Sequence, residues 1–176
     1  MIGRRLLWIV AMFLAFAVGS QAAKAAEVPA DLQPTGYKLL FTAKARGVQI
    51  YTSVAEASAP AKWVLEAPLA TLNGDRGKLT IHHYAGPSWE AGDGSKVVRD
   101  KDTPVKSVPA PHAAADIPWL LIKVSPDPAA GSLSKVGFVQ RIETHGGVAP
   151  AQAPIRPDTK IGVPYTAIYA FYAKVE

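Results

Sequence analysis

The chain of 176 residues contains no cysteine. This absence excludes disulfide bonds, zinc–thiolate sites and thiol catalysis. Disulfides are common in exported proteins, so an exported chain without them must be stabilised by its hydrophobic core. A domain of about 150 residues is large enough for that, because it buries roughly two thirds of the surface of its unfolded chain.

Apolar runs long enough to cross a membrane are also lacking. Arg4 and Arg5 precede an apolar run over residues 6–18, and small residues follow. This run is too short for a membrane-spanning helix of about 20 residues, and the pattern is typical of a secretory signal peptide. We therefore expect residues 1–25 to be a cleaved leader. After cleavage the protein should have no stable membrane anchor and should be periplasmic or extracellular. The alternative is an uncleaved N-terminal anchor. Two cleavage frames fit, Ser20-Gln21-Ala22 and Ala23-Lys24-Ala25.

Clusters of one charge are missing from the remainder of the chain. Three of the 19 basic residues lie in the leader, which leaves 16 basic and 14 acidic residues and a net charge of +2. These residues are scattered singly, without the basic stripe that nucleic acid requires. Nucleic-acid binding therefore loses its electrostatic support.

Helical periodicity is scarce, and 15 prolines are spread along the chain. Long helices are therefore improbable, whereas short alternating segments divided by Gly and Pro turns are frequent. The pattern predicts an extended N-terminal arm over residues 26–36 and a single all-β domain over 37–176. The fold class is an antiparallel sandwich or barrel with long Pro/Gly-rich loops. Strands are expected at 37–44, 48–52, 78–84, 95–98, 117–124, 136–144 and 165–174, and turns at 45–47, 73–77, 93–94 and 145–147.

The stretch from His82 to Ser95 concentrates chemically useful residues on a strand and a tight turn. Because strand neighbours point to opposite faces, His82 and His83 cannot easily bind one metal ion together. Trp89 follows a Gly-Pro pair, where an exposed indole can stack on a sugar ring or another planar ligand. Its alternative role is to fold back and cover the core. Glu90 and Asp93 can supply polar contacts to a ligand, although turn chemistry explains Asp93 equally well.

Two residues farther along the chain complete the candidate ligand site. Arg141 lies on an expected strand, where it can orient a carboxylate ligand or form a structural ion pair. His145 begins the turn His145-Gly146-Gly147. No pair of histidines has metal-ligand spacing, so we predict neither a bound metal nor a cofactor. The candidate site is therefore His83, Trp89, Glu90, Asp93, Arg141 and His145, on condition that the fold brings them together.

Six segments together resemble the secreted bacterial and fungal family known as domain of unknown function 3455. They are residues 47–51, 83–89, 93–95, 117–121, 140–150 and 163–167. The resemblance covers about residues 47–172 and implies no activity and no catalytic residue. Relatives often have Cys in place of Ser53 and near Pro154, which implies a structural cross-link that this chain lacks.

The leading hypothesis is an exported, monomeric, non-catalytic β domain that binds a small or polymeric ligand or the cell envelope. One alternative is a secreted hydrolase in which His83 or His145 acts as general base with Glu90 or Asp93. Another is a structural or stress-related envelope protein without a small ligand. An enzyme is the less favoured class, because no nucleophile elbow or oxyanion hole is recognisable.

Overall fold

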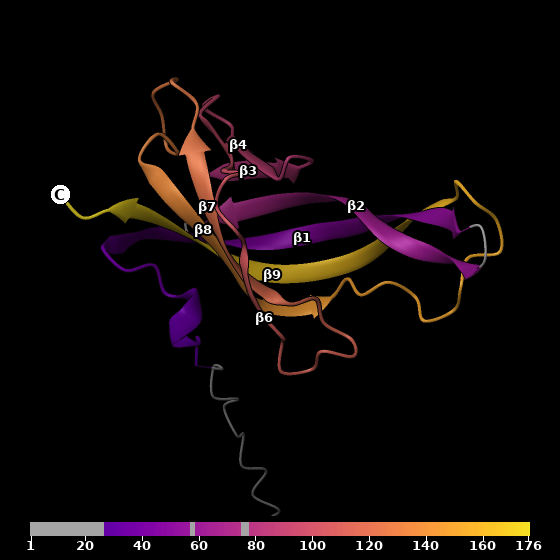
Figure 1. Ribbon diagram of the computed structural model, residues 1–176. Helices are drawn as coiled ribbons and strands as arrows, with labels where there is room; N and C mark the ends of the chain where they lie inside the picture. Colours follow the sequence, from indigo (N-terminus) through magenta and orange to yellow (C-terminus); the bar gives the residue numbers. More distant parts are fainter. Residues whose placement is uncertain (1–26, 57–58, 75–77) are drawn as a thin grey trace, which may run out of the picture.

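The computed structural model describes residues 27–56, 59–74 and 78–176, and these residues form an all-β protein (Figure 1). Eight antiparallel strands close into a barrel, and a ninth short strand pairs with the first residues of one barrel strand. The expected all-β class is thus confirmed, and the architecture is a barrel. The elements are η1 (Ala30–Leu32), β1 (Tyr37–Glu56), β2 (Ala59–Gly74), β3 (Thr80–Tyr84), β4 (Ser88–Ala91), β5 (Lys96–Arg99), β6 (Lys106–Val108), β7 (Trp119–Pro126), β8 (Val136–Gly146) and β9 (Lys160–Lys174).

The strands follow the order β5-β4-β3-β2-β1-β9-β8-β7-β6, and β5 pairs with β7 to close the barrel. This closing pair is short, and it aligns Val97 with Pro126 and Arg99 with Val124. Closure removes the free edges of β5 and β7, which otherwise expose unpaired backbone groups. An eight-stranded barrel is just wide enough for side chains to fill it or for one small ligand.

Small residues on β1 make room for large rings inside the barrel. Ala43 and Ala45 are buried, and Gly47 continues their inward-facing row. A Cβ atom on Gly47 would lie 2.4 Å from Ala70 Cβ and 2.2 Å from Leu69 O. Glycine at this position therefore permits the close approach of β1 and β2, which is a packing requirement.

The predicted turn at residues 45–47 is wrong, because β1 runs through it without interruption and pairs with both β2 and β9. We took Gly47 as a turn signal, whereas it serves strand packing. Likewise, β2 continues through Pro68 without interruption. Proline is tolerated there because β3 pairs only with residues 70–73 of β2, so the outer edge at Pro68 needs no ladder donor.

Three strands extend beyond the barrel and form an arm, which we define as residues 48–56 of β1, 59–69 of β2 and 160–164 of β9. In Figure 1 these strands run together to the right, away from β3, β4 and β7. The loop from 148 to 159 returns along the arm and joins β8 to β9. The arm thus begins where β3 and β8 cease to pair with β2 and β9.

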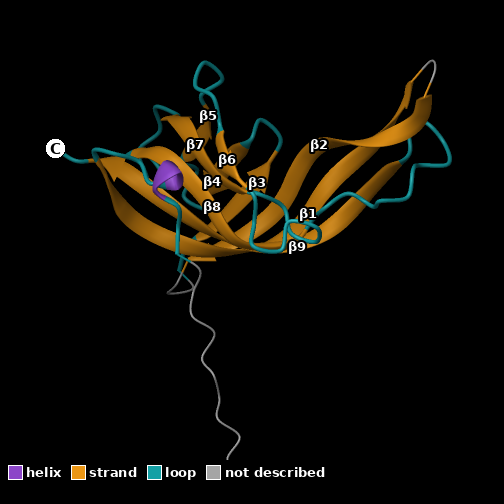
Figure 2. Cartoon of the chain, turned by 60° about the horizontal axis from the view of Figure 1, so that its bottom comes forward, coloured by secondary structure: helices purple, strands orange, loops and turns teal. Residues whose placement is uncertain are grey.

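The N-terminal segment covers the outside of β7 and β8 (Figure 2). Leu32 in η1 is fully buried and packs with Ala110, Trp119 and Leu121 in a second apolar cluster. The Gln140 amide donates a 2.6 Å hydrogen bond to Leu32 O. The expected extended arm over residues 26–36 is therefore, in its described part, a docked segment with one 3-10 turn.

The remaining strand predictions are largely confirmed, but the predicted turn at 145–147 is wrong, because His145 and Gly146 continue β8 and Gly147 forms a β-bridge with Asp116. Strand β7 has both faces covered, since Trp119 and Leu121 pack in the outer cluster while Ile122 and Val124 belong to the barrel core. The Pro-rich segment between β5 and β7 contains the short strand β6. The predicted turn at 73–77 falls mostly on residues 75–77, which lie outside the described residues. Within the described ranges, no helix has the length and apolar character needed to span a membrane.

Candidate functional site

His83 and Trp89 point into the barrel and stack on each other. Strand alternation leaves His82 exposed and buries His83, as predicted. The two strands align His83 with Trp89, so the rings lie 4.5 Å apart at an interplanar angle of 7°. Trp89 is fully buried, so it does not stand at an exposed turn where it would stack on a surface-bound sugar.

Tyr169 on β9 connects this pair to the rest of a polar cluster inside the barrel. Its ring centroid is 5.3 Å from that of His83 and 6.3 Å from that of Trp89. Its hydroxyl lies 3.2 Å from the hydroxyl of Tyr165, and β8 aligns Arg141 directly opposite Tyr169. The fold therefore places Arg141 in the same interior as His83 and Trp89.

Arg141 is a buried cation that only neutral groups contact. Its Nε and Nη2 atoms donate hydrogen bonds of 3.2 and 2.9 Å to Pro118 O. It forms no ion pair with any of the described residues, although it is only 7% exposed. Buried charges are ordinarily paired, because an unpaired one loses most of its hydration energy. The position therefore has the chemistry of an anion site.

Two further buried donors lack acceptors, one on Trp89 inside the barrel and one on Gln49 at the base of the arm, where it joins the barrel. Gln49 Nε2 and Trp89 Nε1 are buried and have no hydrogen-bond partner among the described residues. The Gln49 side chain lies against the Tyr165 hydroxyl, within the same cluster. An unsatisfied buried donor costs about 1–3 kcal/mol, so the interior has an excess of donors that an added acceptor would relieve.

His83 contributes no second positive charge to this cluster. Burial lowers the pKa of His83 to about 4, and the nearby charge of Arg141 lowers it further, against a raising effect from its hydrogen bond to Ser88. Its Nδ1 atom lies 2.9 Å from Ser88 O, a carbonyl that can only accept, so Nδ1 carries the proton. At neutral pH the ring is therefore neutral and its Nε2 is an acceptor.

The interior tyrosines surround the guanidinium and are neutral as well. Burial raises the pKa values of Tyr51, Tyr165 and Tyr169, while the charge of Arg141 opposes this rise in each case. The Tyr51 hydroxyl donates a 2.7 Å hydrogen bond to Gly147 O, which anchors the turn after β8 over this end of the barrel. The cluster therefore carries one net positive charge, on Arg141.

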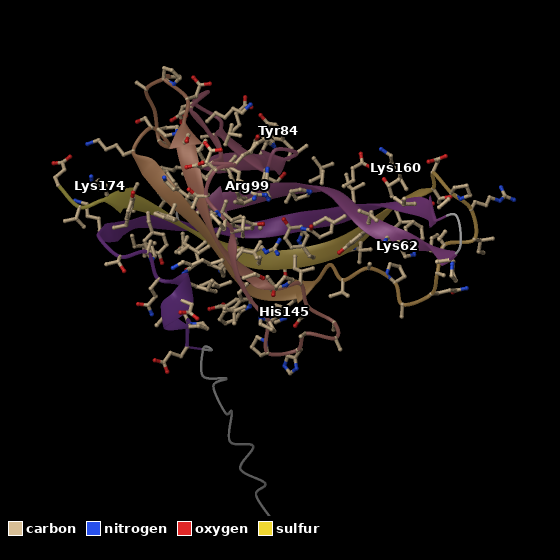
Figure 3. All side chains as sticks on the ribbon, viewed as in Figure 1. Lys62, Tyr84, Arg99, His145, Lys160 and Lys174 are labelled. Carbon is tan, nitrogen blue, oxygen red and sulfur yellow. The ribbon has the colours of Figure 1, made fainter. Side chains whose placement is uncertain are left out.

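His145 does not join the cluster. A bulge in β8 between Ile142 and His145 inserts an extra residue, so the inward position after Arg141 is taken by buried Thr144. His145 lies outside the barrel, 75% exposed in its side chain, in a shallow hollow of about 350 Å³ that Lys44 and Arg46 also line. Figure 3 shows it on the opposite side of the long strands from Tyr84.

Glu90 and Asp93 also lie away from the barrel interior. Glu90 pairs with His82 on the outer face, and its Oε2 accepts a 2.5 Å hydrogen bond from the Tyr84 hydroxyl. Asp93 accepts four hydrogen bonds, from the backbone N–H and hydroxyl groups of Ser95 and Ser132. These bonds lower the pKa of Asp93 and tie the β4–β5 turn to the loop after β7.

Of the six candidate residues, the fold brings together His83, Trp89 and Arg141. The sequence analysis did not identify the interior tyrosines or Gln49. A signal for them existed, because alternation along residues 165–171 places Tyr165 and Tyr169 on one face. On β1, the wrongly predicted turn at residues 45–47 hid the alternation that places Gln49 and Tyr51 on one face. Within the described part of the chain, no group of three His, Asp or Glu side chains is placed to hold a metal ion.

Neither a curated protein nor a solved structure is significantly similar to the chain. A family model described as "Protein of unknown function (DUF3455)" matches residues 34–173, which include the whole barrel. That match spans every strand that lines the polar cluster. The chain belongs to this family of proteins of unknown function.

Proposed function

We propose that this protein is an exported, non-catalytic binding protein whose barrel holds a small anion beside Arg141. The observation that carries the proposal is the excess of hydrogen-bond donors around the buried charge of Arg141. Arg141 has no carboxylate partner among the described residues, and Gln49 and Trp89 each present a buried N–H without an acceptor. An anion beside Arg141 would pair with the guanidinium, and its remaining oxygens would accept from those of the unpartnered N–H groups that it reaches.

The ligand must be small, because aromatic rings fill the barrel. Trp89, Tyr169 and Phe171 are the largest fully buried side chains of the described residues. Formate, acetate and nitrate have suitable chemistry: each is planar and singly charged, and a guanidinium binds such oxygen pairs in a bidentate manner. A polymeric ligand would not enter this interior.

A binding role is favoured over hydrolysis because the groups for acid–base catalysis are apart. His83 Nδ1 is engaged by a backbone carbonyl, and the carboxylates of Glu90 and Asp93 lie outside the barrel with partners of their own. His145 Nδ1 is 3.9 Å from Asp116 Oδ2, beyond hydrogen-bond distance. The arrangement offers no nucleophile beside a base that a carboxylate orients.

Export is the second part of the proposal, and the leader pattern over residues 1–25 supports it. Expression of the full chain in a bacterium, followed by mass measurement of the periplasmic and medium fractions, tests it. The expected product begins after Ala22 or after Ala25. An intact chain that remains in the cytoplasm or in the membrane would refute this part.

Anion binding is testable through thermal stability, because a ligand of the native state raises the melting temperature. The measurement compares formate, acetate and nitrate with the bulky anion gluconate, all at one ionic strength. We expect the small anions to raise the melting temperature of the wild-type protein. Arg141→Gln should abolish that rise, while Arg46→Gln, which alters an exposed arginine on the outer face, should retain it.

Gln49→Leu separates binding from a purely structural role. It removes a buried donor without a partner, so it should stabilise the protein in gluconate by about 1–3 kcal/mol. The same change should reduce the response to the small anions. If wild-type protein does not distinguish the anions, or if Gln49→Leu shifts stability equally in all of them, the proposed site is refuted.

A further inference from the structure

We propose a second binding site, in the groove between the arm and the loop over residues 148–159, for an amphipathic small molecule with an anionic group. The groove has a volume of about 610 Å³ and is lined mainly by apolar side chains. This size falls within the range of small-molecule pockets, which are usually apolar with a few polar groups. Its principal lining residues are Trp63, Pro150, Pro154, Ile155, Arg156 and Ile161.

The walls of the groove are held in place by the chain itself. Trp63 Nε1 donates a 3.0 Å hydrogen bond to Gln152 O, which fixes the indole against the loop. Fully buried Ser53 fastens the other end: its hydroxyl donates to Arg156 O at 2.5 Å and accepts from Thr159 N at 3.0 Å. Because both ends are attached to the arm, a ligand would meet a preformed site with little ordering cost.

Apolar side chains at this site remain in contact with water. Ile155 at the rim of the groove is 90% exposed, and Leu65 is 52% exposed. Leu65 pairs with Tyr51 and Trp63 pairs with Ser53, so both side chains occupy the face of the arm that meets the loop. Neighbouring apolar groups left exposed around a hollow mark a binding surface more strongly than scattered ones.

One charge determines the polarity of the ligand. Arg156 is the single charged residue among the described residues that line the groove, and it forms no ion pair within the described part of the chain. By contrast, Lys160 and Glu66 on the other face of the arm form an ion pair, with Lys160 Nζ 2.6 Å from Glu66 Oε1. An anionic head group beside Arg156 and an apolar body over Ile155 and Trp63 would complement the groove.

The fluorescent probe 1-anilinonaphthalene-8-sulfonate has this chemistry, with aromatic rings and one sulfonate. We expect saturable fluorescence enhancement with folded wild-type protein, and displacement of the probe by decanoate. Arg156→Gln should weaken binding about tenfold, the scale of one charge-assisted hydrogen bond. Ile155→Ser should weaken it severalfold through the lost apolar contact.

Matched controls keep the result specific to the groove. Leu69→Ala removes an exposed apolar side chain from the opposite face of the arm, and Arg46→Gln removes an exposed arginine elsewhere; neither should change binding. Arg141→Gln should also leave probe binding unchanged, so failure here and failure of the barrel site are distinguishable. Decanol, which lacks the charge, should compete about tenfold less well than decanoate, and Arg156→Gln should remove that difference.

Several results would overturn the proposal. One is enhancement that appears only in urea-loosened protein, because the probe also binds partly unfolded chains. Another is a result in which Arg156→Gln and Ile155→Ser bind the probe as strongly as the control variants do. Equal competition by decanol and decanoate would refute the anionic part of the inference.

Discussion

Replacing His83 by asparagine should remove a distinct acid sensitivity from the stability of this protein. The asparagine amide can still donate to Ser88 O in place of Nδ1, while the titrating ring is lost. The stacking on Trp89 is lost too, but that contribution does not change with pH. The comparison therefore isolates the proton equilibrium of one buried ring.

The sign and size of the effect follow from the lowered pKa. The pKa of His83 is about 4 in the folded protein against 6.5 in the unfolded chain, so between these values the unfolded chain binds more protons. Stability from the buried neutral ring is complete above pH 6.5 and is lost progressively as the pH falls toward 4. Between pH 7.5 and pH 4.5 this loss amounts to about 2.5 kcal/mol.

The assay is urea unfolding of wild-type protein and His83→Asn across that pH range. The free-energy difference between the two should shrink by about 2.5 kcal/mol from pH 7.5 to pH 4.5. His82→Asn is the matched control, because His82 is the exposed neighbour on the opposite face, and it should keep the wild-type profile. If the profiles of wild-type protein and His83→Asn run parallel, the ring does not titrate as a buried base and the reasoning fails.

Three further predictions concern the scaffold. Gly47→Ala should destabilise the protein by at least about 2 kcal/mol in urea unfolding, because its Cβ meets backbone of β2 at 2.2 Å, whereas Gly92→Ala, with no contact nearer than 3.8 Å, should be near neutral. Asp93→Asn should lower the melting temperature at neutral pH, because four hydrogen bonds stabilise the carboxylate and lower its pKa. The difference in melting temperature from wild type should shrink in acid, since the carboxylate becomes protonated as the pH falls through its pKa in the folded protein. The double variant Ser53→Cys, Pro154→Cys should oxidise with an unchanged circular dichroism spectrum, because the Ser53 hydroxyl already bonds the loop two residues beyond Pro154; inability to oxidise without distortion would refute a structural cross-link there.

The fold class could be predicted from the sequence because alternation is a local property of strands. His82 and His83 separate to opposite faces, and residues 165–171 alternate between the interior and the outside as expected. The choice between sandwich and barrel depended on the short pairing of β5 with β7, which joins two strands across the intervening loop and β6. No local pattern encodes such a pairing.

The candidate site was predicted only in part, for the same kind of reason. Arg141 and Trp89 meet because β8, β9, β3 and β4 present them to one enclosed interior. Gln49 and Tyr51 were not predicted as interior residues, because Gly47 suggested a turn although it lies within strand β1. The arm groove depends on how the loop over residues 148–159 folds back, which its proline-rich sequence does not specify.

The sequence by itself determined that the protein is a cysteine-free all-β domain with His83 on a strand that leads into a Gly-Pro turn, whereas it placed Trp89 on the turn and not on strand β4. Only the tertiary structure decided what those residues face. Arg141 and His145 are four residues apart, so regular alternation would place both in the barrel. One extra residue in the β8 bulge sends His145 to the solvent and leaves Arg141 inside, because a shift of one residue exchanges the two faces of a strand.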